Sequence, residues 1–216
     1  MKFKIQRKQL KALSRFSATK DIRYYLQGIH VVQNNRGTYL ESTNGHMVGR
    51  LLIDQTPVDG QYSVIIPNDA LKILAATGKK GNEILHFTVD GIKITVIQPD
   101  NTTMQFLALE GNFPDTDRII PMMVKDDEIK PSTYNISYLM AFHDADSDLR
   151  GSKYNSCSVS IKQRGSGSGI VSIGADSRFI GIIMPIKDGD FANVPQWCYL
   201  PKIKPVEAES PVIVTE

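Results

Sequence analysis

One order of secondary structure recurs three times along the chain, and this recurrence limits the possible folds more than any other feature. Each copy reads as a strand, a helix and three further strands, and the copies begin near residues 3, 62 and 133. The expected strands cover residues 3–5, 22–32, 38–42, 46–53, 62–66, 84–89, 92–97, 104–109, 133–136, 156–162, 170–173 and 179–186. The expected helices cover residues 8–18, 67–76 and 137–145. Helices set among antiparallel hairpins predict an α+β fold with the helices gathered on one face of the sheets.

The spacing of apolar residues supports these assignments. Phe3 and Ile5 alternate with polar residues, which is typical of a half-buried strand. In the segment that follows, Leu10 and Leu13 form an apolar stripe that Phe16 extends, and this spacing indicates an amphipathic helix. The change of period within a few residues predicts that a strand leads directly into a helix at the start of the first copy.

The odd number of copies predicts one whole domain and one incomplete domain. Two copies can close on each other into a clamp-like domain at about residues 1–120. The third copy, at about residues 121–187, has no partner copy in the chain and is expected to form a partial domain. Residues 188–216 contain four prolines and little periodicity, and we expect them to form a C-terminal tail.

The composition is that of a globular protein, and no catalytic or metal-binding motif is visible in the sequence. Hydrophobic residues make up 41% of the chain and charged residues 22%, which argues against disorder. The four histidines share no metal-ligand spacing, and the Gly-Ser stretch at residues 165–169 lacks the lysine of a phosphate-binding loop. No nucleophile elbow is present. We therefore expect no catalytic residue, no metal and no cofactor.

The sequence also carries no visible targeting signal. Its first residues alternate polar and apolar instead of forming a signal peptide, and no apolar run approaches the roughly 20 residues that a membrane span needs. Cys157 and Cys198 fit neither a disulfide framework nor a zinc site, so we expect two buried thiols. The predicted location is the cytoplasm.

Basic residues on the first two expected helices and just after the first one suggest nucleic-acid binding. The net charge is only +2, so such binding depends on how the charges are distributed. The basic positions are Lys8, Lys11, Arg15, Lys20, Arg23 and Lys72. A surface of this kind binds phosphates without reading the base sequence. The alternative is a solvated helix face, and Asp144, Asp146 and Asp148 of the third copy would weaken binding if they lined the same surface.

Several short segments, far apart in the chain, together resemble the bacterial sliding clamp, the beta subunit of DNA polymerase III. The segments are Ile-Arg-Tyr-Tyr-Leu-Gln-Gly (22–28), Thr-Asn-Gly-His (43–46), Val-Ile-Ile-Pro (64–67), Glu-Gly-Asn-Phe-Pro-Asp (110–115), Tyr-Asn-Ile-Ser-Tyr-Leu (134–139) and Met-Pro-Ile-Lys (184–187). They fall in the order of the family and span about residues 1–187. The resemblance implies a clamp fold and a polymerase processivity factor that lines or encircles double-stranded DNA.

The resemblance also implies an apolar pocket, between the family's middle and last domains, that binds Q-x-x-L-F type peptides of DNA polymerase and other clamp-binding proteins. The matching pocket positions are Leu26, Thr43, Gly45, His46, Val48, Pro114, Arg118, Ile119, Ile182, Met184, Pro185 and Ile186. An apolar socket suits the leucine and the aromatic residue of such a peptide. The family's DNA contacts near its Tyr-Tyr segment correspond to Lys20, Arg23, Tyr24 and Tyr25.

The chain departs from the family in one turn and in the number of copies. Asn44 stands where the family usually has Asp, and Met47 where it usually has Arg. A family chain has six half-repeats, whereas three are found here, matching the middle domain and the last half-domain. We expect a reduced, phage-like clamp that forms a homo-oligomer of four chains or, with altered packing, of three. The alternative is a clamp mimic that does not encircle DNA and competes with a host clamp for its peptides.

Overall fold

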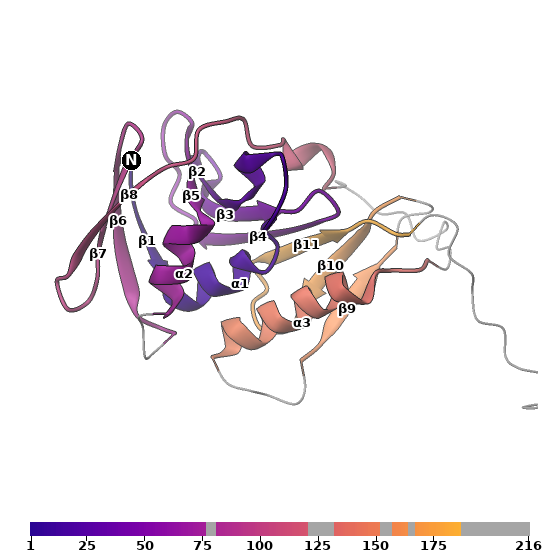
Figure 1. Cartoon of the computed structure of the whole chain (residues 1–216). Helices are drawn as coiled ribbons and strands as arrows, with labels where there is room; N and C mark the ends of the chain where they lie inside the picture. Colours follow the sequence, from indigo (N-terminus) through magenta and orange to yellow (C-terminus); the bar gives the residue numbers. More distant parts are fainter. Residues whose placement is uncertain (77–80, 121–131, 152–156, 164–166, 187–216) are drawn as a thin grey trace, which may run out of the picture.

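In the part of the chain that the computed structural model describes, the elements are two antiparallel sheets and a row of three α-helices, with two short 3-10 helices (Figure 1). The structure describes residues 1–76, 81–120, 132–151, 157–163 and 167–186. No helix within these ranges is both long and apolar enough to cross a membrane. The predicted tail at residues 188–216 lies outside the described residues.

The first two copies exchange their first strands. The four-stranded sheet has the order β1 (Lys2–Gln6), β6 (Ile84–Asp90), β7 (Lys93–Ile97) and β8 (Thr103–Leu107). The seven-stranded sheet has the order β5 (Tyr62–Pro67), β2 (Gly28–Asn34), β3 (Gly37–Thr43), β4 (Met47–Asp54), β11 (Phe179–Ile183), β10 (Gly169–Ile173) and β9 (Val159–Lys162). Because β1 pairs with β6 and β5 pairs with β2, each copy completes the sheet of the other.

The third copy continues the sheet of the first copy. Strand β11 pairs antiparallel with β4, with Ile182 opposite Val48 and Gly181 opposite Gly49. The seven-stranded sheet therefore runs without a break from strands near the start of the chain to strands near residue 183. Any site built on β4 and β11 combines side chains from both ends of the sequence.

The helices lie side by side on one face of the long sheet. They are α1 (Arg7–Ser14), α2 (Asn68–Ala76) and α3 (Ile136–Arg150). Helix α1 packs between α2 and α3 and contacts β2, β3 and β4, whereas α3 contacts β9 and β10 (Figure 1). This arrangement confirms the predicted α+β fold with helices on one face.

Two opposed glycines let aromatic rings rest directly on the sheet where β4 meets β11. A Cβ atom added to Gly49 would lie 2.5 Å from the ring of Phe16, and one added to Gly181 would lie 2.2 Å from the ring of Phe142. The centroids of the two rings are 4.9 Å apart, and both side chains are fully buried. Phe16 lies just after α1 and Phe142 lies within α3, so the two rings tie both helices to the junction between the first and third copies.

The strand predicted for residues 22–32 is wrong in its first half. Residues Tyr24–Leu26 form a short 3-10 helix, η1, and strand β2 begins only at Gly28. The Leu26 amide donates to the Arg23 carbonyl at 2.9 Å, a bond typical of a tight turn. Because Leu26 is fully buried, its apolar character reflects the anchoring of this turn and not the alternation of a strand.

The third copy also differs from its predicted elements. Residues 133–136 form no strand and contribute a single bridge, from Thr133 to Ile186. The third helix runs further than predicted, to Arg150, and ends where Gly151 adopts a left-handed conformation with φ 73°. Glycine is favoured at such a helix end because it has no Cβ to clash. The first helix is shorter than predicted and the last strand ends three residues early.

Candidate peptide-docking site

A row of buried side chains crosses three strands on the sheet face opposite the helices. Thr43 on β3, Val48 on β4 and Ile182 on β11 lie directly opposite one another, so their side chains point to the same face. Leu40 lies three residues before Thr43 on β3, and Leu51 lies three residues after Val48 on β4. Because side chains alternate along a strand, both leucines point to the other face, where they join the main core. All three members of the row are buried.

The short helix η1 adds a further buried apolar side chain. Leu26 is fully buried, and like Val48 and Ile182 it is not a member of the main core cluster. Arg23, just before η1, places its guanidinium against Gly45, where an added Cβ atom would lie 2.9 Å from Arg23 Nη2. This contact brings η1 up to the turn at residues 43–46.

Exposed apolar side chains lie just beyond the buried row. Met184 and Ile186 are 45% and 48% exposed, and Ile119 is 41% exposed. The Met184 amide donates to the His46 carbonyl at 2.9 Å, which fixes the chain after β11 beside the turn that ends β3. The imidazole of His46 stacks on Tyr138 of α3, with the ring centroids 5.7 Å apart. The site thus has a buried apolar floor and an exposed apolar rim.

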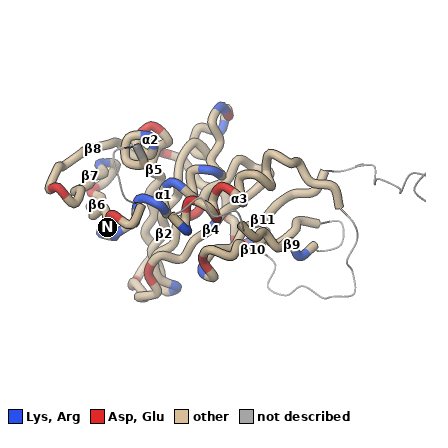
Figure 2. The backbone as a smooth tube through the Cα atoms, turned by 90° about the horizontal axis from the view of Figure 1, so that it is seen from below, with Lys and Arg blue, Asp and Glu red and all other residues tan. Residues whose placement is uncertain are grey.

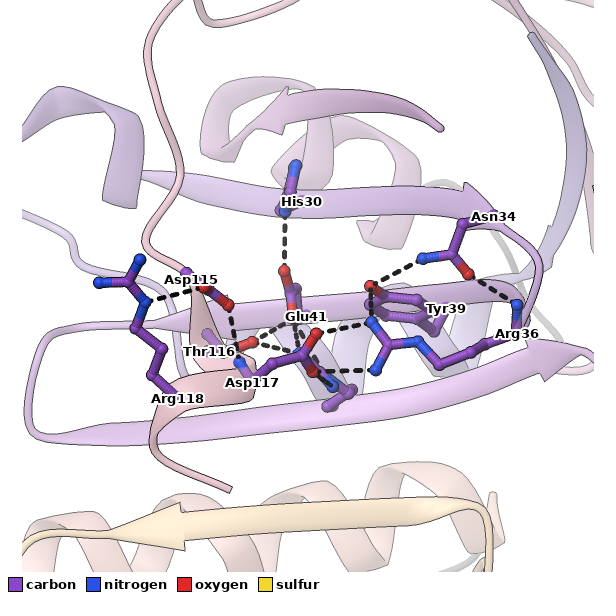
Figure 3. Close-up of polar contacts among 10 residues, drawn as sticks. His30, Asn34, Arg36, Tyr39, Glu41, Asp115, Thr116, Asp117 and Arg118 are labelled. Carbon is purple, nitrogen blue, oxygen red and sulfur yellow. Dashed lines mark hydrogen bonds and ion pairs between the residues drawn. The ribbon is translucent and has the colours of Figure 1, made fainter. Parts of the chain in front are cut away.

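A polar network holds residues 113–118 onto the same sheet face (Figure 3). His30, Glu41 and Arg50 lie opposite one another on β2, β3 and β4. The carboxylate of Glu41 lies 2.8 Å from His30 Nδ1 and accepts hydrogen bonds from Arg50 Nε at 3.0 Å and from the Thr116 hydroxyl at 2.6 Å. Thr116 begins the 3-10 helix η2 (Thr116–Arg118), so the network joins this helix to three strands.

A second carboxylate completes the attachment. Asp117 accepts from Arg36 Nη2 and from Arg50 Nη1, each at 2.6 Å. Phe113 stacks on His30 with ring centroids 4.6 Å apart. These contacts hold both ends of the segment against the sheet.

The network keeps both of its carboxylates ionised at neutral pH. Burial alone would raise the pKa of Glu41, but hydrogen bonds from His30 and Thr116 and the charge of Arg50 lower it below the usual value. The hydrogen bond from Arg36 is the largest influence on Asp117, and together with Arg50 it lowers the pKa of that carboxyl to about 2. The two negative charges therefore face two permanent guanidinium charges.

The attached segment carries two of the predicted pocket residues, Pro114 and Arg118, and a third, Ile119, follows it directly. Asp115 caps η2 by accepting from the Asp117 amide, and it also accepts from Arg118 Nε at 3.0 Å. Arg118 is exposed, as are Pro114 and Ile119. Figure 3 shows Arg118 and Arg36 on opposite sides of η2. The sequence did carry one signal for this network, because a glutamate within the otherwise uncharged strand β3 needs partners when that strand is buried.

The basic residues of the helix face are mostly paired with acids. Lys11 Nζ lies 2.6 Å from Asp148, and Arg15 lies 2.9 Å from Asp148 and 3.2 Å from Asp144. Figure 2 shows the basic positions of α1 beside the acidic positions of α3. The remaining pairs are Arg23 with Asp21 at 2.7 Å and Lys72 with Asp69 at 3.0 Å. Among the described residues, Lys8 and Lys20 make no ion pair within 4.0 Å.

The Tyr-Tyr segment lies on the helix side of the molecule. A cavity of about 350 Å³ is lined by Tyr24 of η1, Ser17 after α1, and Asn68 and Lys72 of α2. Tyr24 is 54% exposed, whereas Tyr25 is half-buried and meets Tyr24 edge to face. Two of the predicted DNA contacts, Tyr24 and Lys72, therefore share one hollow that is separate from the buried row of the sheet face.

Two side chains of the third copy differ from their predictions. Asp146 is completely buried and accepts from Arg150 Nε at 2.7 Å and from the Ala175 amide at 2.6 Å, so it does not belong to the surface formed by its neighbours in sequence. Cys157 is only partly buried, whereas we expected a buried thiol. Cys198 lies outside the described residues.

Comparisons with known proteins agree with the resemblance seen in the sequence. Residues 4–115 match the family model for the DNA polymerase III beta subunit, central domain. The chain is 26% identical over 106 residues to the beta sliding clamps of two Streptococcus pneumoniae strains, and this match covers 49% of the chain and 28% of the relatives. The matched part of the chain therefore spans little more than a quarter of the length of these relatives.

Solved structures extend the similarity of fold over most of the chain. The DNA polymerase III subunit beta of Pseudomonas aeruginosa aligns with a TM-score of 0.65 at 17% identity, covering 87% of this chain and 66% of that one. The subunit of Borrelia burgdorferi, solved in complex with a natural product, aligns with a TM-score of 0.67 at 18% identity, covering 88% and 63%. The family match and the shared fold show that this chain belongs to the beta sliding clamp family, and residues 4–115 match the central domain of that family.

Proposed function

We propose that the chain is a DNA sliding clamp, a non-enzymatic processivity factor that docks partner peptides on its helix-free sheet face. The observation that carries this proposal is the row of Thr43, Val48 and Ile182, which is buried yet separate from the main core. It is bordered by the exposed side chains of Met184 and Ile186. Membership of a non-catalytic family supports a binding function.

The proposed occupant is a short peptide of the Q-x-x-L-F type from a DNA polymerase or another clamp-binding protein. The proposed pocket consists of Leu26, Thr43, Gly45, His46, Val48, Pro114, Arg118, Ile119, Ile182, Met184, Pro185 and Ile186. Each buried apolar anchor of the peptide would contribute roughly 1.5–3 kcal/mol before ordering costs. His46 and Arg118 would orient the polar parts of the peptide, since both are exposed at the rim.

The proposed DNA surface is the helix side, where the family places double-stranded DNA. Its residues would be Lys8, Lys11, Arg15, Lys20, Arg23, Tyr24, Tyr25 and Lys72. A clamp-like domain at about residues 1–120, joined through β4 and β11 to a partial domain at about 121–187, would then supply three half-repeats. Four such chains would provide the twelve half-repeats of a family ring, and three chains would need altered packing. The proposed location is the cytoplasm.

A second function, a clamp mimic that binds clamp-interaction peptides without encircling DNA, is favoured by one observation. Lys11, Arg15, Arg23 and Lys72 each pair with a carboxylate of the chain itself. Paired cations attract phosphates less strongly than free ones, because part of their charge is already neutralised. This observation argues against strong DNA binding by the proposed surface and does not bear on the proposed peptide pocket.

The first test is peptide binding by fluorescence anisotropy with a labelled Q-x-x-L-F peptide. Met184→Asp places a charge on the apolar rim, and we expect it to weaken binding at least tenfold. Met140→Asp is the matched control, because Met140 is similarly exposed at 50% but lies on α3. Equal affinity of Met184→Asp and the wild type would remove the pocket assignment.

A second measurement separates the clamp from the mimic. The protein is loaded on nicked circular DNA, with a clamp loader and ATP where needed, and its retention is followed through gel filtration before and after linearisation. Retention that is lost on linearisation is expected of an encircling clamp, and peptide binding with no retention is expected of the mimic.

A further inference from the structure

The side chains of the proposed peptide site stand on two different kinds of backbone. The floor belongs to three paired strands and comprises Thr43, Val48 and Ile182. One wall belongs to residues 110–120, a segment without a strand that we call the strap, and comprises Pro114, Arg118 and Ile119. The shape of the proposed site therefore depends on how the strap is attached to the sheet.

The backbone of the strap forms no hydrogen bond with a strand in the described part of the chain. The last backbone bond before the strap runs from the Leu109 amide to the Ile65 carbonyl, at 3.0 Å. Within the strap, the backbone bonds run from the Ile119 and Ile120 amides to the Thr116 carbonyl, at 3.2 and 3.3 Å. Side chains alone therefore attach the strap to the sheet.

Thr116 makes the buried part of this attachment. It is the one residue among 110–120 that is buried, with 2% of its surface exposed. Its hydroxyl donates to Glu41 Oε2 at 2.6 Å and accepts from Arg50 Nη2. A hydroxyl can donate and accept at once, and hydrogen bonds to ionised partners are the stronger kind. One hydroxyl group thus joins the strap to strands β3 and β4.

The partners of this hydroxyl are held in place without the strap. Glu41 and Arg50 form an ion pair at 2.8 Å, and Glu41 also contacts His30 Nδ1 at 2.8 Å. The guanidinium of Arg50 lies over the Tyr39 ring, 4.8 Å from its centroid, as Figure 3 illustrates around Tyr39. The sheet therefore offers the strap a fixed attachment point.

This attachment point lies one row of side chains away from the pocket floor. Glu41 is two residues before Thr43 on β3, and Arg50 is two residues after Val48 on β4, so both rows point to the same face. Two residues of a strand span roughly 7 Å. The strap is thus anchored directly beside the floor.

The strap wall begins close to the anchor. In a 3-10 helix the chain advances about 2 Å per residue, so Ile119 lies roughly 6 Å beyond Thr116 along η2. Figure 3 shows Arg118 on the side of η2 away from Arg36, which belongs to the hairpin before β3. Because β3 runs from that hairpin to Thr43, Arg118 lies toward the end of the strand that carries the floor.

We propose that Thr116 is the positioning residue of the peptide site, because its hydroxyl sets where the strap wall stands relative to the floor. This inference rests on the proposed peptide docking and deepens it, since Thr116 acts on the peptide through Arg118 and Ile119. Without the hydroxyl, the peptide has to order the strap when it binds, and this ordering lowers the affinity.

The test compares three variants by anisotropy with the labelled Q-x-x-L-F peptide. Thr116→Val keeps the shape of the side chain but removes the hydroxyl, and we expect it to weaken binding about tenfold. Thr116→Ser keeps the hydroxyl and should bind as the wild type does. Thr38→Val is the matched control, because Thr38 is also buried on β3 and its hydroxyl accepts from Gln33 at 3.0 Å. Wild-type affinity of Thr116→Val, or equal losses in Thr116→Val and Thr38→Val, would overturn the positioning role.

A double-mutant cycle distinguishes positioning from a general loss of structure. Arg118→Ala with Ile119→Ala removes the side chains that Thr116 is proposed to position. On this background Thr116→Val should cause little further loss of peptide affinity, because the residues of one linked unit do not act additively. A further tenfold loss would show that Thr116 acts by another route and would overturn the proposal.

Hydrogen exchange measures the strap without any peptide. We expect Thr116→Val to speed exchange in residues 113–119 and to leave exchange in β3 and β4 unchanged, because Glu41 and Arg50 keep each other as partners. Far-UV circular dichroism checks that each variant is folded. Unchanged exchange in the strap, or faster exchange throughout the sheet, would contradict a local role for Thr116.

The positioning role and the peptide site can fail separately. If Met184→Asp weakens peptide binding and Thr116→Val does not, the peptide site stands and the positioning role is overturned. If the wild type binds no peptide, both proposals are overturned, because no peptide site remains for Thr116 to position.

Discussion

The two sides of the long sheet use their charged residues in different ways. On the helix-free side, Glu41 and Arg50 are largely buried and bind a distant segment of the same chain. On the helix side, Lys11 and Arg15 pair with α3 at a partly exposed surface. Charges of the first kind position a backbone segment, whereas charges of the second kind mainly reduce the field that the surface presents to solvent.

This difference shows which proposal the structure supports more strongly. The proposed peptide site depends on backbone positions that are fixed by several hydrogen bonds and by strand pairing. The proposed DNA surface depends on cations whose pairing with acids opposes DNA binding. Four changes test the contrast, from the largest expected effect to the smallest.

Removing a buried charge from the network should produce the largest effect. Arg50→Met leaves Glu41 buried and takes one partner from Asp117, so we expect the free energy of unfolding to fall by about 3 kcal/mol. Urea unfolding measures this change. Arg118→Met is the control, because Arg118 also pairs with an aspartate but its side chain is 83% exposed, and it should cost less than about 1 kcal/mol. Equal losses in the two variants would mean that burial of the network does not matter.

The junction between the first and third copies should be sensitive to one methyl group. Gly181→Ala places a Cβ atom against the ring of Phe142, and we expect a loss of about 1–3 kcal/mol in urea unfolding together with weaker peptide binding, because Ile182 is the next residue. Ser172→Ala on the neighbouring strand β10 is the control and should change stability by less than about 0.5 kcal/mol. Unchanged stability and peptide affinity would show that the third copy docks without this close contact.

Removing the acidic partners should strengthen DNA binding. Asp144→Asn with Asp148→Asn frees Lys11 and Arg15, and we expect a rise in affinity of about tenfold for a double-stranded DNA at low salt, with a steeper dependence on salt. Fluorescence anisotropy over a series of salt concentrations measures both. Asp90→Asn with Asp100→Asn changes the net charge equally on hairpins of the other sheet, and should have a smaller effect. Identical behaviour of the two double variants would favour the clamp mimic.

Acid should weaken the attachment of η2 to the sheet. The folded-state pKa of Asp117 is lowered to about 2, so its contribution is present above the unfolded pKa near 4 and is lost as the pH falls from about 4 toward 2. Because Asp117 is 45% exposed, we expect this contribution to be only about 1 kcal/mol. Urea unfolding at pH 7, 4, 3 and 2 should show a smaller dependence on pH for Asp117→Asn than for the wild type. The same dependence in both would place the acid sensitivity elsewhere.

Local pattern was sufficient to predict most of the elements. The alternation of Phe3 and Ile5 and the stripe of Leu10 and Leu13 predicted strand β1 and helix α1 nearly where they occur, because each pattern depends only on which side of one element faces the core. The prediction failed at Leu26, where an apolar side chain anchors a 3-10 turn. The motifs of the resemblance identified the family, but they carried no information on how the pocket residues are held.

The sequence by itself determined the three-fold recurrence of elements, the α+β class and the membership of the clamp family. Only the tertiary structure decided that β4 meets β11, that Glu41 and Arg50 bind the segment around Thr116, and that Lys11 and Arg15 are paired with Asp144 and Asp148. The physical reason is the range of the interactions. Periodicity arises among neighbours a few residues apart, whereas these contacts join residues from 66 to more than 130 positions apart in the sequence. Such contacts depend on which surfaces of the sheets and helices pack together in the folded chain.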